Sequence, residues 1–146
     1  MAIVTLQNPK ILLGPANPPT IDWSDHIASV TISQNLDIHE TTQMDDTAKR
    51  YVPGLQDNQI QIEFLQDFED NSLEEFFNAP APSSLIGTII YCEITPTSGA
   101  VSASNPKFSF EIVVSQWQPI NASVGNISTI DVNWPINGVI TKTITP

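Results

Sequence analysis

The sequence predicts a mainly β domain, a β-sandwich or a partly closed barrel, with one short flanking α-helix and one long loop. Three observations predict this fold class. Apolar and polar residues alternate with a period of two in several short segments, turn residues separate these segments, and only one segment has helical spacing. With 146 residues, the chain is long enough for one domain with a sizeable core.

The N-terminal part differs in composition from the rest of the chain. Residues 8–20 contain four prolines and a glycine, which predicts a proline-rich, irregular arm over residues 1–20 and a single β-sandwich domain over residues 21–146. The first residues lack the basic and apolar pattern of a signal peptide, and no apolar stretch is long enough to span a membrane. The chain is therefore expected to stay in the reducing cytoplasm in which it is made.

Six segments alternate in the way that half-buried strands do. Asn58–Leu65 is the clearest, because Ile60, Ile62 and Phe64 face one side and polar residues face the other. Asn137-Gly138 predicts a hairpin turn, and the Thr- and Ile-rich strand after it would be an exposed edge able to pair with another subunit. The other predicted strands are Ile27–Gln34, Ile86–Thr95, Phe108–Trp117, Ile127–Trp134 and Val139–Thr145.

Two segments lack this alternation. Asn71–Phe77 predicts a short helix, with Ser72 and Glu75 at capping-box spacing. From Asn35 to Asn58 the periodicity fades and acidic residues accumulate. Loops longer than ~12–15 residues are uncommon in compact domains and are usually functional or disordered. We interpret this segment as an assembly loop, and a floppy surface excursion is the alternative.

Charge is scarce and mostly negative. Only 14% of the residues are charged and the formal net charge is −11, whereas soluble domains usually have roughly 25% charged residues. A surface of Asn, Gln, Ser and Thr can be buried against a neighbour without removing many ions from water, which suits a subunit of an assembly. The acidic balance disfavours binding to nucleic acid and to anionic membranes.

Four acidic residues lie near the middle of four predicted strands, one per strand and on the polar side. They are Glu63, Glu93, Glu111 and Asp131. If these strands share one sheet, its polar face carries isolated negative charges among neutral side chains. Without other information, an ordinary solvated face is the simpler interpretation.

No pattern typical of a catalytic site occurs in the sequence, and we predict that the protein is not an enzyme. His26 and His39 each lie beside an acidic residue, but exposed loop histidines fit these positions better than the base of a small hydrolase. Cys92 excludes an internal disulfide because it is the only cysteine, and its place on an apolar strand face predicts a buried, inert thiol.

Oxygen ligands cluster in Asp67-Phe68-Glu69-Asp70-Asn71, where a calcium ion could bind. Counted from Asp67, however, the sixth position is Ser72 and the twelfth is Asn78, where an EF-hand loop requires Gly and Glu. Helix capping is the favoured interpretation of these residues, so neither a metal site nor a cofactor is predicted.

The order and spacing of several short segments resemble the major tail proteins, or tail tube proteins, of long-tailed bacteriophages. Together these segments extend over about residues 21–145. They are Ile21-Asp22-Trp23-Ser24-Asp25 before Ala28–Gln34, Asp46-Thr47-Ala48-Lys49-Arg50, Gly54-Leu55-Gln56-Asp57 before Ile60–Phe64, Phe64-Leu65-Gln66-Asp67-Phe68, Pro96-Thr97-Ser98, Ser104-Asn105-Pro106-Lys107-Phe108 and Val132-Asn133-Trp134-Pro135.

The resemblance implies a β-sandwich related to the tube protein of type VI secretion systems. Six copies would form a ring, and rings would stack into a tail tube around the tape measure protein, between a tail terminator and tail-tip proteins. Assembly would take place in the cytoplasm of the host bacterium, and DNA would leave through the emptied tube.

By the same resemblance, the long loop would bridge to the neighbouring ring, with Asp45, Asp46, Lys49, Arg50 and Tyr51 as the candidate contacts. The acidic residues would line the lumen and repel the passing duplex without adhesion. The candidate lumen residues are Gln59, Gln61, Glu63, Glu93, Glu111 and Asp131.

Two alternatives remain at this point. One is a tube subunit of another contractile injection or secretion system. The other is a monomeric carbohydrate-binding β-sandwich, in which Trp23, Trp117 and Trp134 would stack on sugars. A binding module would stay monomeric, while a tube subunit would form rings or tubes.

Overall fold

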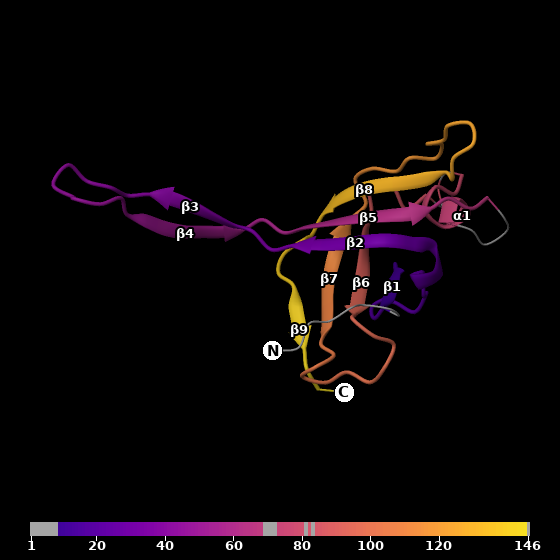
Figure 1. Ribbon diagram of the computed structural model, residues 1–146, viewed down its shortest axis with the longest axis horizontal. Helices are drawn as coiled ribbons and strands as arrows, with labels where there is room; N and C mark the ends of the chain where they lie inside the picture. The colour runs from indigo at the N-terminus through magenta and orange to yellow at the C-terminus, as the bar shows by residue number, and fades with distance from the viewer. Residues whose placement is uncertain (1–8, 69–72, 81, 83, 146) are drawn as a thin grey trace.

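A computed structural model describes residues 9–68, 73–80, 82 and 84–145 of the chain (Figure 1). The strands within these residues form three antiparallel sheets. The elements are β1 (Lys10–Gly14), the 3-10 helix η1 (Ser24–His26), β2 (Ile27–Ser33), β3 (Leu36–Glu40), β4 (Tyr51–Gln56), β5 (Gln59–Leu65), α1 (Leu73–Phe77), β6 (Ile89–Thr95), β7 (Lys107–Val113), β8 (Thr129–Pro135) and β9 (Thr141–Thr143).

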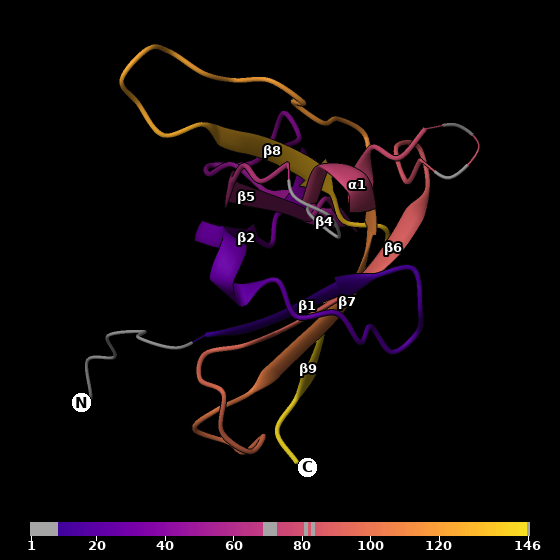
Figure 2. The same ribbon diagram turned by 90° about the vertical axis from the view of Figure 1, so that its right-hand side faces the viewer.

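Two of the sheets form a sandwich. The three-stranded sheet has the order β2-β5-β8, and the four-stranded sheet has the order β1-β6-β7-β9. The strands of the two sheets run crosswise in Figure 1, and Figure 2 shows one sheet layered over the other. Such crossing is typical of orthogonal sheet packing. Neither sheet closes into a barrel, so the β-sandwich prediction is confirmed.

The predicted alternation builds the core between the sheets. Ile60, Ile62 and Phe64 of β5 are fully buried, and they lie opposite apolar residues of β2 and β8. Helix α1 closes one end of the core, where Phe77 stacks on Trp117 at a ring-centroid distance of 4.8 Å. Each large apolar side chain buried here contributes about 1.5–3 kcal/mol. This core fixes the orientation of the two outer faces.

The first strand corrects the prediction of an irregular N-terminal arm. Residues Lys10–Gly14 form β1, which pairs with β6, and Ile11 and Leu13 are buried in the core. The outer edge of β1 is covered in turn, because Leu13 N–H donates to Ile21 O and Trp23 N–H donates to Ile11 O. Proline and glycine at residues 14–19 end the strand but do not prevent it.

The segment from Asn35 to Asn58 is also more regular than predicted. Strands β3 and β4 pair with each other, with a register shift between Leu36 and Ile38, and extend the chain path of β2 and β5 into a two-stranded arm. The arm points away from the sandwich in Figure 1. Only residues 41–50 remain a loop, at the tip of the arm.

The C-terminal segment departs from the predicted hairpin. Strands β8 and β9 lie in different sheets, and β9 pairs with β7. Ile136 bridges to Ile112 of β7, and Gly138 has a φ of 96°, which L side chains rarely adopt. Asn137-Gly138 therefore turns the chain from one sheet to the other. Strand β9 is nevertheless an edge strand, as predicted.

Several element boundaries differ from the predictions. Ile86 and Ile127, both expected in strands, precede β6 and β8 and are exposed. Helix α1 begins at Leu73, and the predicted capping residue Ser72 lies outside the described residues. None of the helices found among the described residues has the length and apolar character needed to cross a membrane.

Candidate assembly surfaces

The root of the arm is held by Asn58, which is almost completely buried at 1% exposure. Its side-chain NH2 donates to Gln56 Oε1 and to Gly138 O, each at 3.1 Å, and its Oδ1 accepts from Asn35 N–H at 3.3 Å. The backbone carbonyl of Asn58 accepts a hydrogen bond from Ile136 N–H at 2.9 Å. One side chain thus ties both ends of the arm to the crossover between the sheets.

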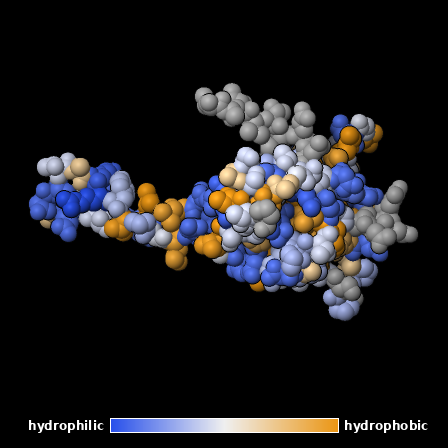
Figure 3. All heavy atoms as spheres, turned by 90° about the horizontal axis from the view of Figure 1, so that it is seen from below, coloured by the Kyte–Doolittle hydropathy of each residue, from blue (hydrophilic) through white to orange (hydrophobic). Residues whose placement is uncertain are grey.

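The stem of the arm exposes apolar side chains to solvent. Leu55 is 83% exposed and Ile38 is 62% exposed, and Met44 at the tip is fully exposed. Figure 3 shows hydrophobic side chains along the stem and a hydrophilic tip. The other large apolar residues exposed on the arm are Leu36, Tyr51 and Val52.

The tip of the arm is ordered by Asp46. Its carboxylate accepts from Gln43 N–H at 2.7 Å and lies 3.0 Å from Arg50 Nε, as an i,i+4 ion pair. Arg50 N–H also donates to Thr42 Oγ1 at 3.0 Å. The predicted loop contacts Asp45, Asp46, Lys49 and Arg50 lie in the tip, and Tyr51 begins β4.

The polar face of the β2-β5-β8 sheet is regular and carries no basic side chain. Cross-strand partners form three rows, Ser29–Glu63–Asp131, Thr31–Gln61–Asn133 and Ser33–Gln59–Pro135. Glu63 and Asp131 lie directly opposite each other. Like charges in this position destabilise a sheet. The sequence therefore keeps two carboxylates together on a face that offers them no counter-charge.

The other two acidic candidates lie elsewhere. Glu93 of β6 and Glu111 of β7 belong to the four-stranded sheet, so the four acidic residues do not share one sheet. Glu93 lies 3.7 Å from Lys107 Nζ, and Glu111 accepts a hydrogen bond from Asn137 Nδ2 at 2.9 Å. Glu63, by comparison, accepts only a long hydrogen bond of 3.5 Å from Ser29 Oγ, and neither Glu63 nor Asp131 makes an ion pair with a described residue.

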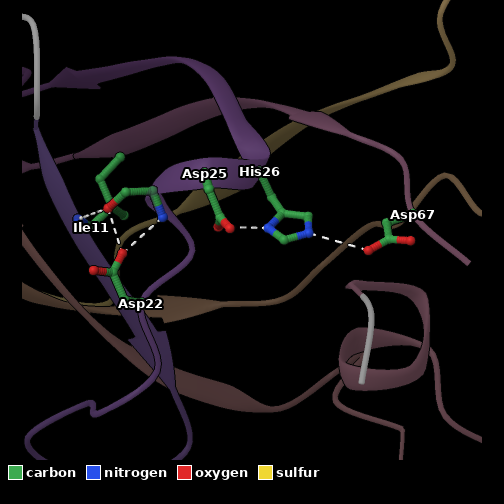
Figure 4. Close-up of polar contacts among 6 residues, drawn as sticks. Ile11, Asp22, Asp25, His26 and Asp67 are labelled. Carbon is green, nitrogen blue, oxygen red and sulfur yellow. Dashed lines mark hydrogen bonds and ion pairs between the residues drawn. The ribbon is translucent and has the colours of Figure 1, made fainter. Parts of the chain in front are cut away.

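A carboxylate–histidine–carboxylate arrangement joins the start of β2 to the segment after β5. His26 Nδ1 lies 2.7 Å from Asp25 Oδ1, and His26 Nε2 lies 3.2 Å from Asp67 Oδ2 (Figure 4). Burial lowers the pKa of His26, but the hydrogen bonds and charges of Asp25 and Asp67 outweigh it, so the pKa is raised. This site is an electrostatic clamp between two segments that are far apart in the sequence.

The clamp continues into the backbone of β1. Ile11 N–H donates to Ser24 Oγ at 2.9 Å, and Ser24 N–H donates to Asp22 Oδ1 at 2.9 Å, as Figure 4 shows. The segment Asp22–His26 thus fixes β1 and β2 relative to each other. The sequence places Asp25 beside His26, but it could not indicate the second partner, because Asp67 is 41 residues away.

The histidines and the cysteine have no arrangement typical of catalysis. Both ring nitrogens of His26 are engaged by carboxylates, so neither is free to accept a proton from a nucleophile. His39 lies apart from it, exposed on β3 of the arm. Cys92 is buried, as predicted, and burial, followed by the charge of Glu93, raises the pKa of its thiol well above its usual range.

The tryptophans do not form a sugar-stacking surface. Trp23 and Trp134 are buried, at 5% and 0% exposure. Trp117 is half-buried and donates its indole N–H to Glu74 Oε2 at 2.7 Å. Within the described part of the chain, no group of three His, Cys, Asp or Glu side chains could hold a metal ion. The candidate calcium ligands at residues 69–71 lie outside that part.

Comparison with known proteins gives a match by fold. No protein-family model and no curated protein sequence matches the chain. Among solved structures, the chain is similar to a chain in the virion of a native gene transfer agent particle, with a TM-score of 0.61 and 11% sequence identity. The match covers 91% of this chain and 95% of that chain, so the two share their fold over nearly their whole lengths.

Proposed function

We propose that this protein is a structural subunit of a virion that self-assembles into stacked rings of six copies and forms a tail tube for DNA ejection. The observation that carries this proposal is the two-stranded arm, which projects from the sandwich and exposes apolar side chains on its stem. The shared fold with a chain of a virion particle supports the same class of function.

The arm has the properties of a segment that docks on a neighbour. An isolated two-stranded hairpin is marginally stable in water. Five exposed apolar side chains on β3 and β4 leave hydrophobic area uncovered in the single chain, and burying it would contribute about 25 cal/mol per Å². The arm would therefore bridge to the next ring, with Asp45, Asp46, Lys49, Arg50 and Tyr51 at or near the contact.

The edges of the sheets support contacts within a ring. The outer edge of β8 is partly blocked, because Gln118 Oε1 accepts from Asp131 N–H and Asn121 Nδ2 donates to Thr129 O. Strand β2 is the opposite edge of the same sheet, seven residues long and free of charge and proline. Such an edge readily pairs with another chain. Two different edges on one subunit suit head-to-tail contacts, which close into rings.

The face of β2, β5 and β8 is the proposed lumen wall. It combines neutral polar side chains with the unneutralised Glu63 and Asp131, so a ring would present negative charge to a passing duplex. Gln59 and Gln61 lie on the same face. Glu93 and Glu111 face the other side of the sandwich and are not part of this proposed wall.

In this function, the tube would surround the tape measure protein and contact tail terminator and tail-tip proteins at its ends. Assembly would occur in the cytoplasm of a host bacterium. The protein would not catalyse a reaction. The contacts of both His26 ring nitrogens with carboxylates agree with this. The buried tryptophans disfavour the carbohydrate-binding alternative.

Negative-stain electron microscopy and light scattering of the purified protein test the proposal. We expect rings and tubes, and we expect the Ile38→Ser/Leu55→Ser variant to lose tubes while its melting temperature is retained, because both side chains are exposed. Ile127→Ser is the matched control, since Ile127 is 79% exposed but lies outside the arm. A protein that stays monomeric up to high concentration, or tubes that tolerate the arm substitutions, would contradict the proposal.

A further inference from the structure

The outer face of the four-stranded sheet carries a hollow framed by two lysines. Its volume is about 210 Å³, and the polar residues of its lining are Lys10, Glu93, Thr95 and Lys107. The register places Lys10, Thr95 and Lys107 in one row, because Lys10 pairs with Thr95, and Phe108 pairs with Ile94 next to it. Two ammonium groups from β1 and β7 therefore flank one hydroxyl from β6.

The hydroxyl at the centre of this row lacks a partner. Thr95 is 7% exposed, and its Oγ1 makes no hydrogen bond with any described residue. A buried hydroxyl left unpaired costs about 1–3 kcal/mol. Lys10 likewise makes no ion pair within the described residues, while Lys107 lies 3.7 Å from Glu93. Because Thr95 Oγ1 is itself buried from solvent, the group that the hollow offers to an oxygen anion is the ammonium group of Lys10.

We infer that this hollow binds a carboxylate from the arm of a second copy of the chain, an inference that rests on the proposed self-assembly. The chain has only five basic residues against sixteen acidic ones. Two of the five, Lys49 and Arg50, lie on the arm, and Lys10, Lys107 and Lys142 lie on the four-stranded sheet. The basic side chains of the sandwich are therefore confined to one sheet.

The arm supplies carboxylates that have no basic partner in their own chain. Asp46 pairs with Arg50, whereas Asp37, Glu40 and Asp45 are exposed and make no ion pair with a described residue. In Figure 1 the arm points away from the end of β6 and the start of β7, where the hollow lies, so its tip cannot fill the hollow of the same chain. A carboxylate of the arm can therefore reach the hollow only from another subunit.

Charge reversal tests the inference. Lys10→Glu should raise the critical concentration for tube formation by about tenfold or more, because it sets like charges against each other at the contact. Glu40→Lys/Asp45→Lys should do the same, and combining the two changes should restore tubes. Lys142→Glu is the matched control on the same sheet, because Lys142 pairs with Phe108 and so lies on the opposite side of the sheet from the hollow. Circular dichroism melting of each variant verifies the fold.

A substitution of Glu93 should strengthen the proposed contact between subunits, whereas Lys10→Glu should weaken it. Its carboxylate competes for Lys107, so Glu93→Gln leaves two uncompensated lysines and should make tubes more resistant to salt. Rings that fail to stack in Lys10→Glu and stack again in the charge swap support the inference. Tubes unaffected by Lys10→Glu, or a swap that does not restore them, overturn it and leave the proposed function standing. Failure of the unsubstituted protein to assemble overturns both.

Discussion

Glu63 and Asp131 face each other across β5 and β8 with no basic side chain on the same face. A sheet selected for the stability of the single chain would not keep this pair, because like charges directly opposite each other are destabilising. By contrast, Glu93 lies 3.7 Å from Lys107 Nζ of its own sheet, and Glu111 accepts a hydrogen bond of 2.9 Å from Asn137 Nδ2. At the residue scale, the unneutralised pair is the feature that distinguishes one outer face of the sandwich from the other.

Removing one of these charges should stabilise the protein. Asp131→Asn is expected to raise the free energy of unfolding by about 0.2–1 kcal/mol at neutral pH, and added salt should reduce the gain. Urea denaturation at two ionic strengths measures both effects. Glu111→Gln is the control and should lower the free energy of unfolding, because the Glu111 carboxylate accepts a hydrogen bond from Asn137. A loss of stability in Asp131→Asn would show that the pair is not repulsive.

The clamp at His26 should make stability depend on pH. The pKa of His26 is raised in the folded protein, so the folded state binds the proton more tightly than the unfolded state does. This stabilisation is fully present below the unfolded pKa of about 6.5 and is lost as pH rises through the higher folded pKa. We expect a contribution of about 0.2–1 kcal/mol, in the range of exposed ion pairs.

Denaturation of the unsubstituted protein and of His26→Asn from pH 5.5 to 8.5 tests this expectation. The difference in unfolding free energy between the two proteins should shrink as pH rises. His39→Asn is the matched histidine substitution, because His39 lies on the arm and takes no part in the contacts of Asp25 and Asp67. A difference that grows with pH would mean that the folded state favours the neutral imidazole.

At the scale of elements, sequence alone predicted the strands whose two faces have different surroundings. Ile60, Ile62 and Phe64 alternate with Gln59, Gln61 and Glu63 because one face meets the core and the other meets solvent. Both faces of the arm strands are exposed, so nothing imposed such a pattern on Leu36–Glu40 or Tyr51–Gln56. For that reason the two strands were missed, and the loop was predicted to be longer than residues 41–50.

The pairing of the strands could not be predicted from the sequence for a related reason. Alternation shows that Glu63 and Glu93 are on polar faces, but it cannot show that their strands belong to different sheets. Asn137-Gly138 likewise specifies a turn without specifying the strands that it joins. Long-range contacts decide both, as they decide the pairing of His26 with Asp67. The position of the candidate lumen residues on polar faces was predictable, and their division between two sheets was not.

The arm depends on a close backbone approach at Gly54. A Cβ atom at this position would lie 2.8 Å from His39 Nε2 and 3.1 Å from Asp37 O, so Gly54→Ala should distort the pairing of β3 with β4. The cost is about 1–3 kcal/mol, as for other overpacked sites. Because the arm lies outside the core, we expect weaker assembly with little change in melting temperature.

Light scattering gives the critical concentration for assembly of Gly54→Ala. Adding His39→Ala should recover part of the loss, because it removes the closest contact but leaves the backbone oxygen of Asp37 in place. Gly14→Ala, at the end of β1 and outside the arm, is a suitable control, since its nearest neighbour would be 3.9 Å from the new Cβ. Normal assembly of Gly54→Ala would show that the arm is not needed in this conformation.

At the scale of the whole molecule, the charges are segregated between the two outer faces. The face of β2, β5 and β8 has carboxylates and no base, while the β1-β6-β7-β9 sheet and the arm tip carry all five basic residues. In the proposed tube, one face would meet DNA and the other surfaces would meet neighbouring subunits. Of the sixteen acidic residues, Glu63 and Asp131 would then belong to the lumen, and the arm would supply acids for docking.

Tubes assembled from Glu63→Lys/Asp131→Lys protein test whether the face of β2, β5 and β8 meets the DNA. Both side chains lie on the polar face, away from the core, so tubes should still form. Each subunit then contributes two positive charges in place of two negative ones to the proposed wall, and the duplex carries one negative charge per ~1.7 Å. We therefore expect the variant tubes to retain short duplex DNA that the unsubstituted tubes exclude. The logarithm of the binding constant should fall linearly with the logarithm of the salt concentration.

Co-sedimentation of labelled DNA with the tubes measures the retention, and a phage carrying the variant would eject its DNA more slowly. Glu111→Lys, on the other sheet, is the control that adds positive charge without placing it on the proposed wall. If this control retained DNA and Glu63→Lys/Asp131→Lys did not, the four-stranded sheet would face the lumen instead. The face on which added lysines cause the tubes to retain DNA is therefore the face that lines the lumen.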